Sequence, residues 1–293
     1  MSQPATKKSA QLVTLDRAMK DLPPMPMAVS KILTLTGDEN SRADEVEKYI
    51  ATDQAISTKV LRVVNSPYFG LESQVSSLSQ AVLILGFEQV RNLVLSLSSA
   101  KLFSATSPAI KAIHMELWKH AFATGAAAQI VARRCRIELK EHDFVFSGGL
   151  LSNVGALFLA AQYSKPYEAI WTKANTEGGQ ISDFESRAFG VHHAELGQQL
   201  GVLWKFPENL CLLVGRHEGP FGGDPIPSLY AVHAGDRIAR VAIKPKESWG
   251  EVEQIDPLVL EWMKFSTKDF QLVLEETQQK LESASDMIGL LSG

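Results

Sequence analysis

The stretch FVFSGGLLSNVGALFLAA, residues 144–161, is the part of the chain that decides the fold. It is almost entirely apolar, and after residue 150 its only polar side chains are Ser152 and Asn153. It also contains three glycines, which are Gly148, Gly149 and Gly155. A helix that is apolar on all sides is normally buried. The stretch therefore predicts one buried helix that packs closely against its neighbours.

Helical spacing of apolar residues continues on both sides of this stretch. Five short helices are indicated before residue 105, and a longer one runs from Pro108 to the basic cluster at residues 133–136. Further helices are indicated at residues 167–176, 193–204, 207–217, 227–243 and 268–290. No alternating pattern with a hairpin turn competes with them. We therefore expect an all-α protein.

Composition and charge exclude several classes of protein. The chain has 293 residues, of which 45% are hydrophobic and 21% charged, and this balance is not that of a disordered protein. Its formal net charge of −4 gives no broad attraction to phosphate backbones or to anionic lipid. We therefore expect neither nucleic acid nor a membrane surface as a partner.

The lack of a recognisable targeting signal and the pattern of cysteines predict a cytoplasmic protein. The first twenty residues contain two adjacent lysines with no apolar run behind them, which is not the pattern of a signal peptide or an anchor. The most apolar runs, at residues 81–87 and 155–161, are far shorter than the roughly 20 residues that cross a bilayer. Cys135 and Cys211 lack any zinc-binding spacing and are typical of reduced thiols.

Residues 43–66, ADEVEKYIATDQAISTKVLRVVNS, are a candidate helix-turn-helix. A recognition helix normally carries a surplus of positive charge toward phosphates. Counted with Arg42, which directly precedes the segment, the basic and acidic side chains are equal in number: Arg42, Lys48, Lys59 and Arg62 against Asp44, Glu45, Glu47 and Asp53. We therefore favour two packed helices, and a DNA-binding regulator is the alternative.

Four side chains on the later helices are candidate metal ligands: His120, His193, His217 and Asp236. Imidazole and carboxylate groups from separate helices can converge on a metal ion in a helical bundle. Isolated histidines are more often hydrogen-bonded residues of the core or the surface. Spacing alone leaves both interpretations open.

Several segments, in a fixed order, resemble the HDOD domain, which is a bacterial signalling relative of the HD-type metal phosphohydrolases. The first half contains LPPMPMAVSKIL (22–33), DQAISTKVLRVVNSPYFG (53–70) and SLSQAVLILGFEQVRNLVL (77–95). The second half contains LWKHAFATGAAAQIVA (117–132), FSGGLLSNVGALFLA (146–160), HHAELGQQLGVLWKFPENL (192–210) and GRHEG (215–219). Residues 230–238 resemble the aspartate-bearing helix of the wider HD superfamily.

This resemblance implies an HD-like multi-helical fold with an N-terminal helical bundle. The implied HDOD domain spans residues 15–219. It divides into a bundle at residues 15–105 and an HD-like subdomain at residues 106–219. Residues 220–293 are then a C-terminal helical extension.

The resemblance also assigns positions to the candidate site. Active HD enzymes carry adjacent histidine and aspartate residues that bind metal and orient a water molecule, and this chain has Ser152 and Asn153 at those positions. The other matching positions are His120, His193, His217 and Asp236. Glu218 stands where some relatives have a second consecutive histidine.

HDOD domains generally lack the histidine and aspartate pair, and they are regarded as regulatory or scaffolding modules of bacterial signalling. The resemblance therefore implies a non-catalytic module that contacts a signalling protein or senses a ligand. His120, Ser152, Asn153, His193, His217 and Asp236 would form its residual pocket. No cofactor is expected, although residual binding of a divalent metal stays open. The alternative is a metal-dependent phosphohydrolase with an atypical site on His120, His193, His217 and Asp236.

Two further segments allow more than one interpretation. In residues 65–70, NSPYFG, the rings of Tyr68 and Phe69 either anchor a partner or pack into the core. The apolar residues of the expected helix at 268–290 either join a partner or pack on their own chain.

Overall fold

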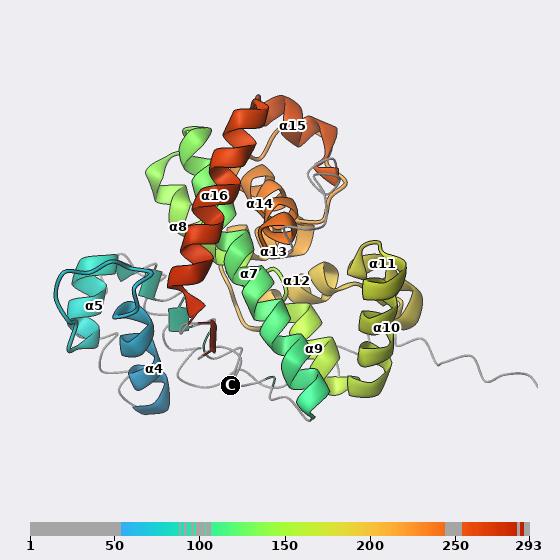
Figure 1. Ribbon diagram of the computed structural model, residues 1–293, viewed down its shortest axis with the longest axis horizontal. Coiled ribbons are helices and arrows are strands. Elements are labelled where there is room, and N and C mark those ends of the chain that lie inside the picture. The colour runs from blue at the N-terminus through green and yellow to red at the C-terminus, as the bar shows by residue number, and fades with distance from the viewer. Residues whose placement is uncertain are drawn as a thin grey trace, which may run out of the picture.

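The computed structural model of the chain describes residues 54–87, 89–90, 93–94, 97, 103, 107–243, 254–285 and 288–289. These residues form helices joined by turns and loops, and no strand occurs among them (Figure 1). The prediction of an all-α protein is therefore confirmed. The helices expected before residue 54, and with them the first half of the candidate helix-turn-helix, lie outside the described residues.

The described helices fall into three groups along the chain. The first group is α4 (Gln54–Val64) and α5 (Leu78–Leu85). The central group is α7 (Pro108–Arg134), α8 (Leu139–Leu151), α9 (Val154–Gln162), α10 (Ser164–Glu177), α11 (Ile181–Phe189), α12 (His193–Leu203) and α13 (Glu208–Arg216). The last group is α14 (Pro227–Ile243), α15 (Pro257–Met263) and α16 (Thr267–Ser283). The sequence patterns did not predict α11 or α15.

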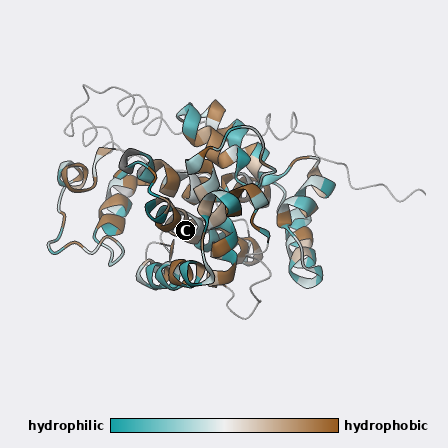
Figure 2. Ribbon diagram, turned by 90° about the horizontal axis from the view of Figure 1, so that it is seen from above, coloured by the Kyte–Doolittle hydropathy of each residue, from teal (hydrophilic) through white to brown (hydrophobic). Residues whose placement is uncertain are grey.

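The long helix α7 is the axis on which the other helices pack, and α8, α14 and α16 all lie against it. It begins where Ser107 caps the first turn by accepting a hydrogen bond from the Ile110 amide at 3.2 Å. Gly235 of α14 lies so close to α7 that a methyl group there would stand 2.6 Å from the Thr124 carbonyl oxygen. Small residues thus bring α14 directly onto α7. Figure 2 shows hydrophilic and hydrophobic residues alternating along the outer helices.

The apolar stretch at residues 144–161 is buried as predicted, but it is not one helix. Helix α8 ends at Leu151, and α9 begins at Val154. At the break, Asn153 leaves the helical conformation with φ −93° and ψ 11°. The Ser152 hydroxyl donates a hydrogen bond to the Gly149 carbonyl at 2.8 Å. Serine and asparagine compete with the backbone for such bonds, and this explains why the expected single helix is wrong.

Glycines around this break bring the neighbouring helices into close contact, as the sequence pattern indicated. A methyl group on Gly149 would stand 2.5 Å from Gly125 of α7. A methyl group on Gly155 would stand only 2.1 Å from the carbonyl oxygen of His193 at the start of α12. The contact between α9 and α12 therefore places Asn153 and His193 near one another.

The same apolar stretch has the length and composition of a membrane span, but it is buried in the protein. The segment Phe144–Gln162 is long and apolar enough to cross a bilayer by composition, with a mean hydropathy of 1.7. However, 89% of its most apolar window is buried inside the protein. A core segment of a soluble protein has the same composition, so the apolar run gives no support to a membrane span.

The loop after α4 is held by hydrogen bonds and by aromatic packing. The Asn65 side chain donates to the Val75 carbonyl at 2.8 Å and accepts from the Val75 amide at 2.7 Å. The half-buried Tyr68 ring lies 4.9 Å from the Phe122 ring of α7 and 5.9 Å from the Phe146 ring of α8. These contacts favour the interpretation that Tyr68 packs into the protein.

The C-terminal helix α16 packs on its own chain. Its buried residues are Val273, Thr277 and Leu281. Glu276 forms an ion pair with Arg133, and Asp269 lies 3.4 Å from Arg134, so the basic end of α7 is paired with α16. Intrachain packing thus accounts for Val273 and Leu281, whereas Leu272 on the same helix is exposed.

Candidate functional site

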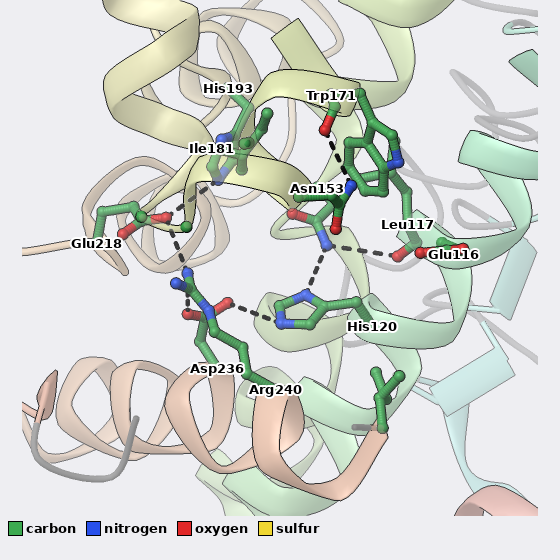
Figure 3. Close-up of a pocket in the computed structure, with 15 residues that line it drawn as sticks. Glu116, Leu117, His120, Asn153, Trp171, Ile181, His193, Glu218, Asp236 and Arg240 are labelled. Atoms are coloured by element: carbon green, nitrogen blue, oxygen red, sulfur yellow. Dashed lines mark hydrogen bonds and ion pairs between the residues drawn. The ribbon is translucent and has the colours of Figure 1, made fainter. Parts of the chain in front are cut away.

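A pocket of about 330 Å³ lies among α7, α9, α10, α12 and α14 (Figure 3). Its polar lining residues are Glu116, His120, Asn153, Asn175, His193, Glu218, Asp236 and Arg240. Much of the remaining lining is apolar and includes Leu117, Trp171, Ile181 and Ile243. The pocket therefore combines a polar, charged part with apolar side chains that suit the body of a small organic molecule.

Two buried carboxylates in the pocket are held by arginines. Asp236 Oδ2 lies 2.9 Å from Arg240 and 3.3 Å from Arg237. Glu218 lies 2.7 Å from Arg237 through Oε2 and 3.5 Å from Arg240 through Oε1. Burial alone would raise the pKa of each carboxyl, but the arginines hold that of Glu218 at about 2 and that of Asp236 well below its usual range. Both carboxylates are therefore ionised and neutralised within the protein.

His120 is held by Asn153 in one tautomer. The Asn153 Nδ2 atom lies 3.4 Å from the Leu117 carbonyl, which can only accept, and 3.0 Å from His120 Nδ1. The amide therefore donates to Nδ1, and the proton of the neutral ring is on Nε2. Burial lowers the pKa of His120 to about 4, so this ring is neutral at pH 7. His120 Nε2 lies 3.6 Å from Asp236 Oδ1 and has no hydrogen-bond partner.

His193 is held by Glu185, a residue that the sequence patterns did not single out. Glu185 Oε2 accepts from His193 Nδ1 at 2.6 Å and from the His193 amide at 2.8 Å. Glu185 Oε1 accepts from the Tyr167 hydroxyl at 2.8 Å. Burial would lower the pKa of His193, but Glu185, followed by Glu218 and Asp236, raises it to about 9. His193 is therefore an imidazolium at neutral pH, with Nε2 at 3.4 Å from Glu218.

A signal for Glu185 exists in the sequence. It stands four residues after Ile181 and four before Phe189, in the apolar stripe of α11. If the expected helix register is right, an acidic residue at such a position is buried, and a buried acidic residue needs a partner. Glu185 is fully buried, and its partners come from α10 and α12.

The remaining candidate residues lie outside the pocket lining. The Ser152 side chain is fully buried and bonds to its own helix. His217 is also fully buried, and its Nδ1 donates to the Val214 carbonyl at 2.8 Å. Its Nε2 has no hydrogen-bond partner, and one ligand atom from each of His193, His217 and Glu218 lies within 4.8 Å of the others. The structure thus brings His120, Asn153, His193 and Asp236 to one pocket, places His217 beside it, and turns Ser152 away.

The chain matches the model of one protein family. The model of the HDOD domain matches residues 22–220 of the chain. The chain belongs to the HDOD family. An uncharacterized protein of Treponema pallidum (strain Nichols) is 24% identical over 283 residues, which cover 95% of this chain and 52% of that protein. The chain thus spans about half the length of this curated relative.

Solved structures share the fold of this HDOD protein. One from Shewanella amazonensis SB2B, named "Putative phosphohydrolase", has a TM-score of 0.72 at 20% identity and covers 94% of this chain and 97% of its own. An HDOD domain protein with unknown function from Geobacter sulfurreducens has a TM-score of 0.64 at 22% identity, with 94% and 96% covered. A "Putative signal transduction protein" from Marinobacter aquaeolei VT8 has a TM-score of 0.72 at 19% identity, with 95% and 61% covered. At these identities the likeness shows the fold alone, and it confirms the HD-like architecture.

The residues of this HDOD pocket do not fit the binuclear metal centre of an HD enzyme. Such a centre needs carboxylates that are available to bridge cations and imidazoles that present lone pairs. Here Asp236 is paired with two arginines, and His120 presents an N–H group instead of a lone pair. Asn153 supplies a neutral amide that is already bonded to His120 and Leu117. The donor set is therefore that of a hydrogen-bonded, charge-balanced pocket.

A further histidine, His233 of α14, links three segments beside the pocket of this HDOD protein. Its Nδ1 donates to the His217 carbonyl at 2.7 Å, and its Nε2 accepts from the Asp256 amide at 3.1 Å. Burial, with the nearby Arg237, lowers the pKa of His233 to about 4. Only the neutral ring can both donate and accept in this arrangement.

We expect His233 to contribute to an acid-induced loss of stability. Its pKa is about 6.5 in the unfolded chain and about 4 in the folded one, so its contribution is complete above pH 6.5 and lost as the pH falls to 4. The shift corresponds to about 3 kcal/mol. Urea unfolding of the wild type and of His233→Gln should therefore give a stability difference that narrows from pH 7.5 to pH 4.5. A difference that is the same at every pH would contradict this expectation.

Proposed function

We propose that this HDOD protein is a non-catalytic regulatory module of bacterial signalling, which senses a small ligand in its pocket or contacts a signalling protein. The observation that carries the proposal is the state of Ser152 and Asn153, which occupy the metal-binding positions of active relatives. The Ser152 hydroxyl is bonded to its own helix, and the Asn153 amide is bonded to His120. Neither side chain supplies the anion that would bind metal and hold a hydrolytic water.

Charge balance in the pocket supports ligand sensing over hydrolysis. Arg237 and Arg240 neutralise Glu218 and Asp236, and the His193 imidazolium is neutralised by Glu185. A phosphate-bearing substrate would need positive charge beyond this internal pairing. The pocket therefore suits a small molecule without net negative charge, whose apolar part contacts Leu117 and Trp171.

The protein is expected to show no phosphohydrolase activity. Purified full-length chain would be incubated with Mn²⁺, Fe²⁺ or Mg²⁺ and with nucleotides, cyclic dinucleotides and a generic phosphodiester, and released phosphate or product would be measured. The expected rate equals that of buffer with the same metal, because no side chain activates water. Hydrolysis that Asp236→Ala abolishes would overturn the proposal.

A metal-dependent phosphohydrolase is the second candidate function. It is favoured by the unpartnered Nε2 atom of His217 and by the cluster of His193, His217 and Glu218. This candidate predicts divalent metal at near stoichiometry in protein purified without chelator, as measured by elemental analysis. A metal-free preparation that cannot be reconstituted would exclude it.

Cytoplasmic location and the absence of a nucleic-acid partner stay predictions.

A further inference from the structure

Arg240 occupies the space between the two carboxylates of the pocket (Figure 3). We propose that its guanidinium takes the place of a divalent metal ion as the positive charge between these carboxylates. We also propose that Asn153 prevents His120 from binding a metal, because it fixes the proton of the ring on Nε2. The inference rests on the proposed function, because both require that the native pocket holds no resident metal.

The position of Arg240 carries the first part of the inference. One terminal nitrogen lies 2.9 Å from Asp236 Oδ2 and 3.5 Å from Glu218 Oε1, so a single cationic group contacts both side chains. Arg237 also contacts both side chains, but it holds the other Glu218 oxygen, Oε2, and does not line the pocket. Both carboxylates are buried, and buried anions require a nearby positive charge. A metal ion between these oxygens would meet this guanidinium at short range and be repelled.

The pairing of Asn153 with His120 carries the second part. The amide nitrogen donates to His120 Nδ1, so the proton of the neutral ring must be on Nε2. This N–H group, and not a lone pair, then faces Asp236 at 3.6 Å. An aspartate at position 153 would instead accept a hydrogen bond from Nδ1, and the Nε2 lone pair would become available for a metal.

Other donors for a cation are already in place beside Arg240. His217 has a buried Nε2 atom without a hydrogen-bond partner, and its Nδ1 donates to Val214, so Nε2 presents a lone pair. One ligand atom from each of His193, His217 and Glu218 lies within 4.8 Å of the others. His193 is an imidazolium whose Nε2 faces Glu218, so the donors ready for a cation are His217 and Glu218. Imidazole nitrogens with carboxylate oxygens suit first-row divalent ions such as Mn²⁺.

The test is to remove the Arg240 guanidinium and to measure whether Mn²⁺ binds in its place. The double variant Asn153→Asp with Arg240→Gln removes the Arg240 guanidinium from the pocket, keeps Arg237 on Glu218 Oε2 and Asp236 Oδ2, and reverses the hydrogen bond to His120. Mn²⁺ binding would be measured by calorimetry, and thermal unfolding would be followed with Mn²⁺ or with chelator. We expect the double variant to bind Mn²⁺ at least about tenfold more tightly than the wild type. We also expect saturating Mn²⁺ to raise its Tm by about 5 °C.

Arg240→Lys, combined with Asn153→Asp, is the matched control, because it keeps a positive charge at the same place. This control should bind Mn²⁺ no better than the wild type. If the double variant binds no better than the control, or if the wild type binds as tightly as the double variant, the inference is overturned. A double variant that folds only when Mn²⁺ is present supports it.

A single variant keeps the inference testable if the double variant does not fold at all. Arg240→Gln alone retains Asp236, Glu218 and His217 and should still gain Mn²⁺ affinity over the wild type. Equal affinity of this single variant and the wild type overturns the inference while the proposed function stands. Hydrolysis by the wild type with bound metal would overturn the proposed function as well, so the two failures are distinguishable.

Discussion

Replacing Glu185 with alanine is expected to destabilise the protein by about 3 to 5 kcal/mol, which is the usual cost of breaking a buried charge pair. The substitution would leave the His193 imidazolium without its nearest buried counter-charge and the Tyr167 hydroxyl without an acceptor. It would also remove the acceptor of the His193 amide at the first turn of α12. Urea unfolding at pH 7 would measure the loss.

Two further substitutions separate the causes of this effect. Glu185→Gln keeps an oxygen that accepts from Tyr167 but removes the charge, so we expect a smaller loss than for alanine. Without that charge the pKa of His193 should fall from about 9, which NMR titration of the ring would detect. Glu168→Ala changes an exposed glutamate on α10 and should alter stability by less than about 0.5 kcal/mol. A loss of under about 1 kcal/mol for Glu185→Ala would contradict a buried ion pair.

Replacing Gly155 with alanine is expected to cost about 3 kcal/mol or more, at or above the upper end of ordinary overpacking. The added methyl group would stand 2.1 Å from the His193 carbonyl oxygen and 2.9 Å from the Gly197 amide nitrogen. These are backbone atoms, so no change of side-chain rotamer can relieve the contact. Helices α9 and α12 would have to separate, and Asn153 and His193 would move apart with them.

Gly222→Ala is the matched control for this prediction. Gly222 has no atom within 4 Å of an added methyl group, so the same chemical change should be almost neutral. The two variants would be compared by chemical denaturation. A Gly155→Ala protein as stable as Gly222→Ala would show that α9 and α12 are not in close contact in solution.

Much of the fold could be predicted from the sequence because apolar spacing and glycines act locally. Residues 227–243 were expected as a helix, and α14 has those bounds. The break at Ser152 was missed because apolar residues continue on both sides of it, and the conformation of Asn153 depends on contacts with α7. Helix α11 was missed because it is short and because the charge of Glu185 interrupts its apolar stripe.

The candidate site could be predicted only in part, because the residues that set its chemistry come from helices far apart in the sequence. The matching positions His120, His193 and Asp236 came from resemblance, and the structure places them around one pocket. The groups that decide their chemistry come from other elements, as in the pairing of Glu185 with His193. Arg240 lies four residues after Asp236, but its contact with Glu218 joins segments that spacing cannot relate. Charge compensation of this kind appears only when the helices are in place.

Helix α14 has a consequence for the size of the functional unit. The family match ends at residue 220, yet α14 begins at Pro227 and supplies Asp236, Arg237 and Arg240. A chain cut at the family boundary would leave Glu218 without either arginine and would uncover the face of α7 on which Gly235 lies. The recognisable motif and the smallest unit that keeps the pocket therefore differ in length. Searches for the ligand need protein that extends at least through residue 243.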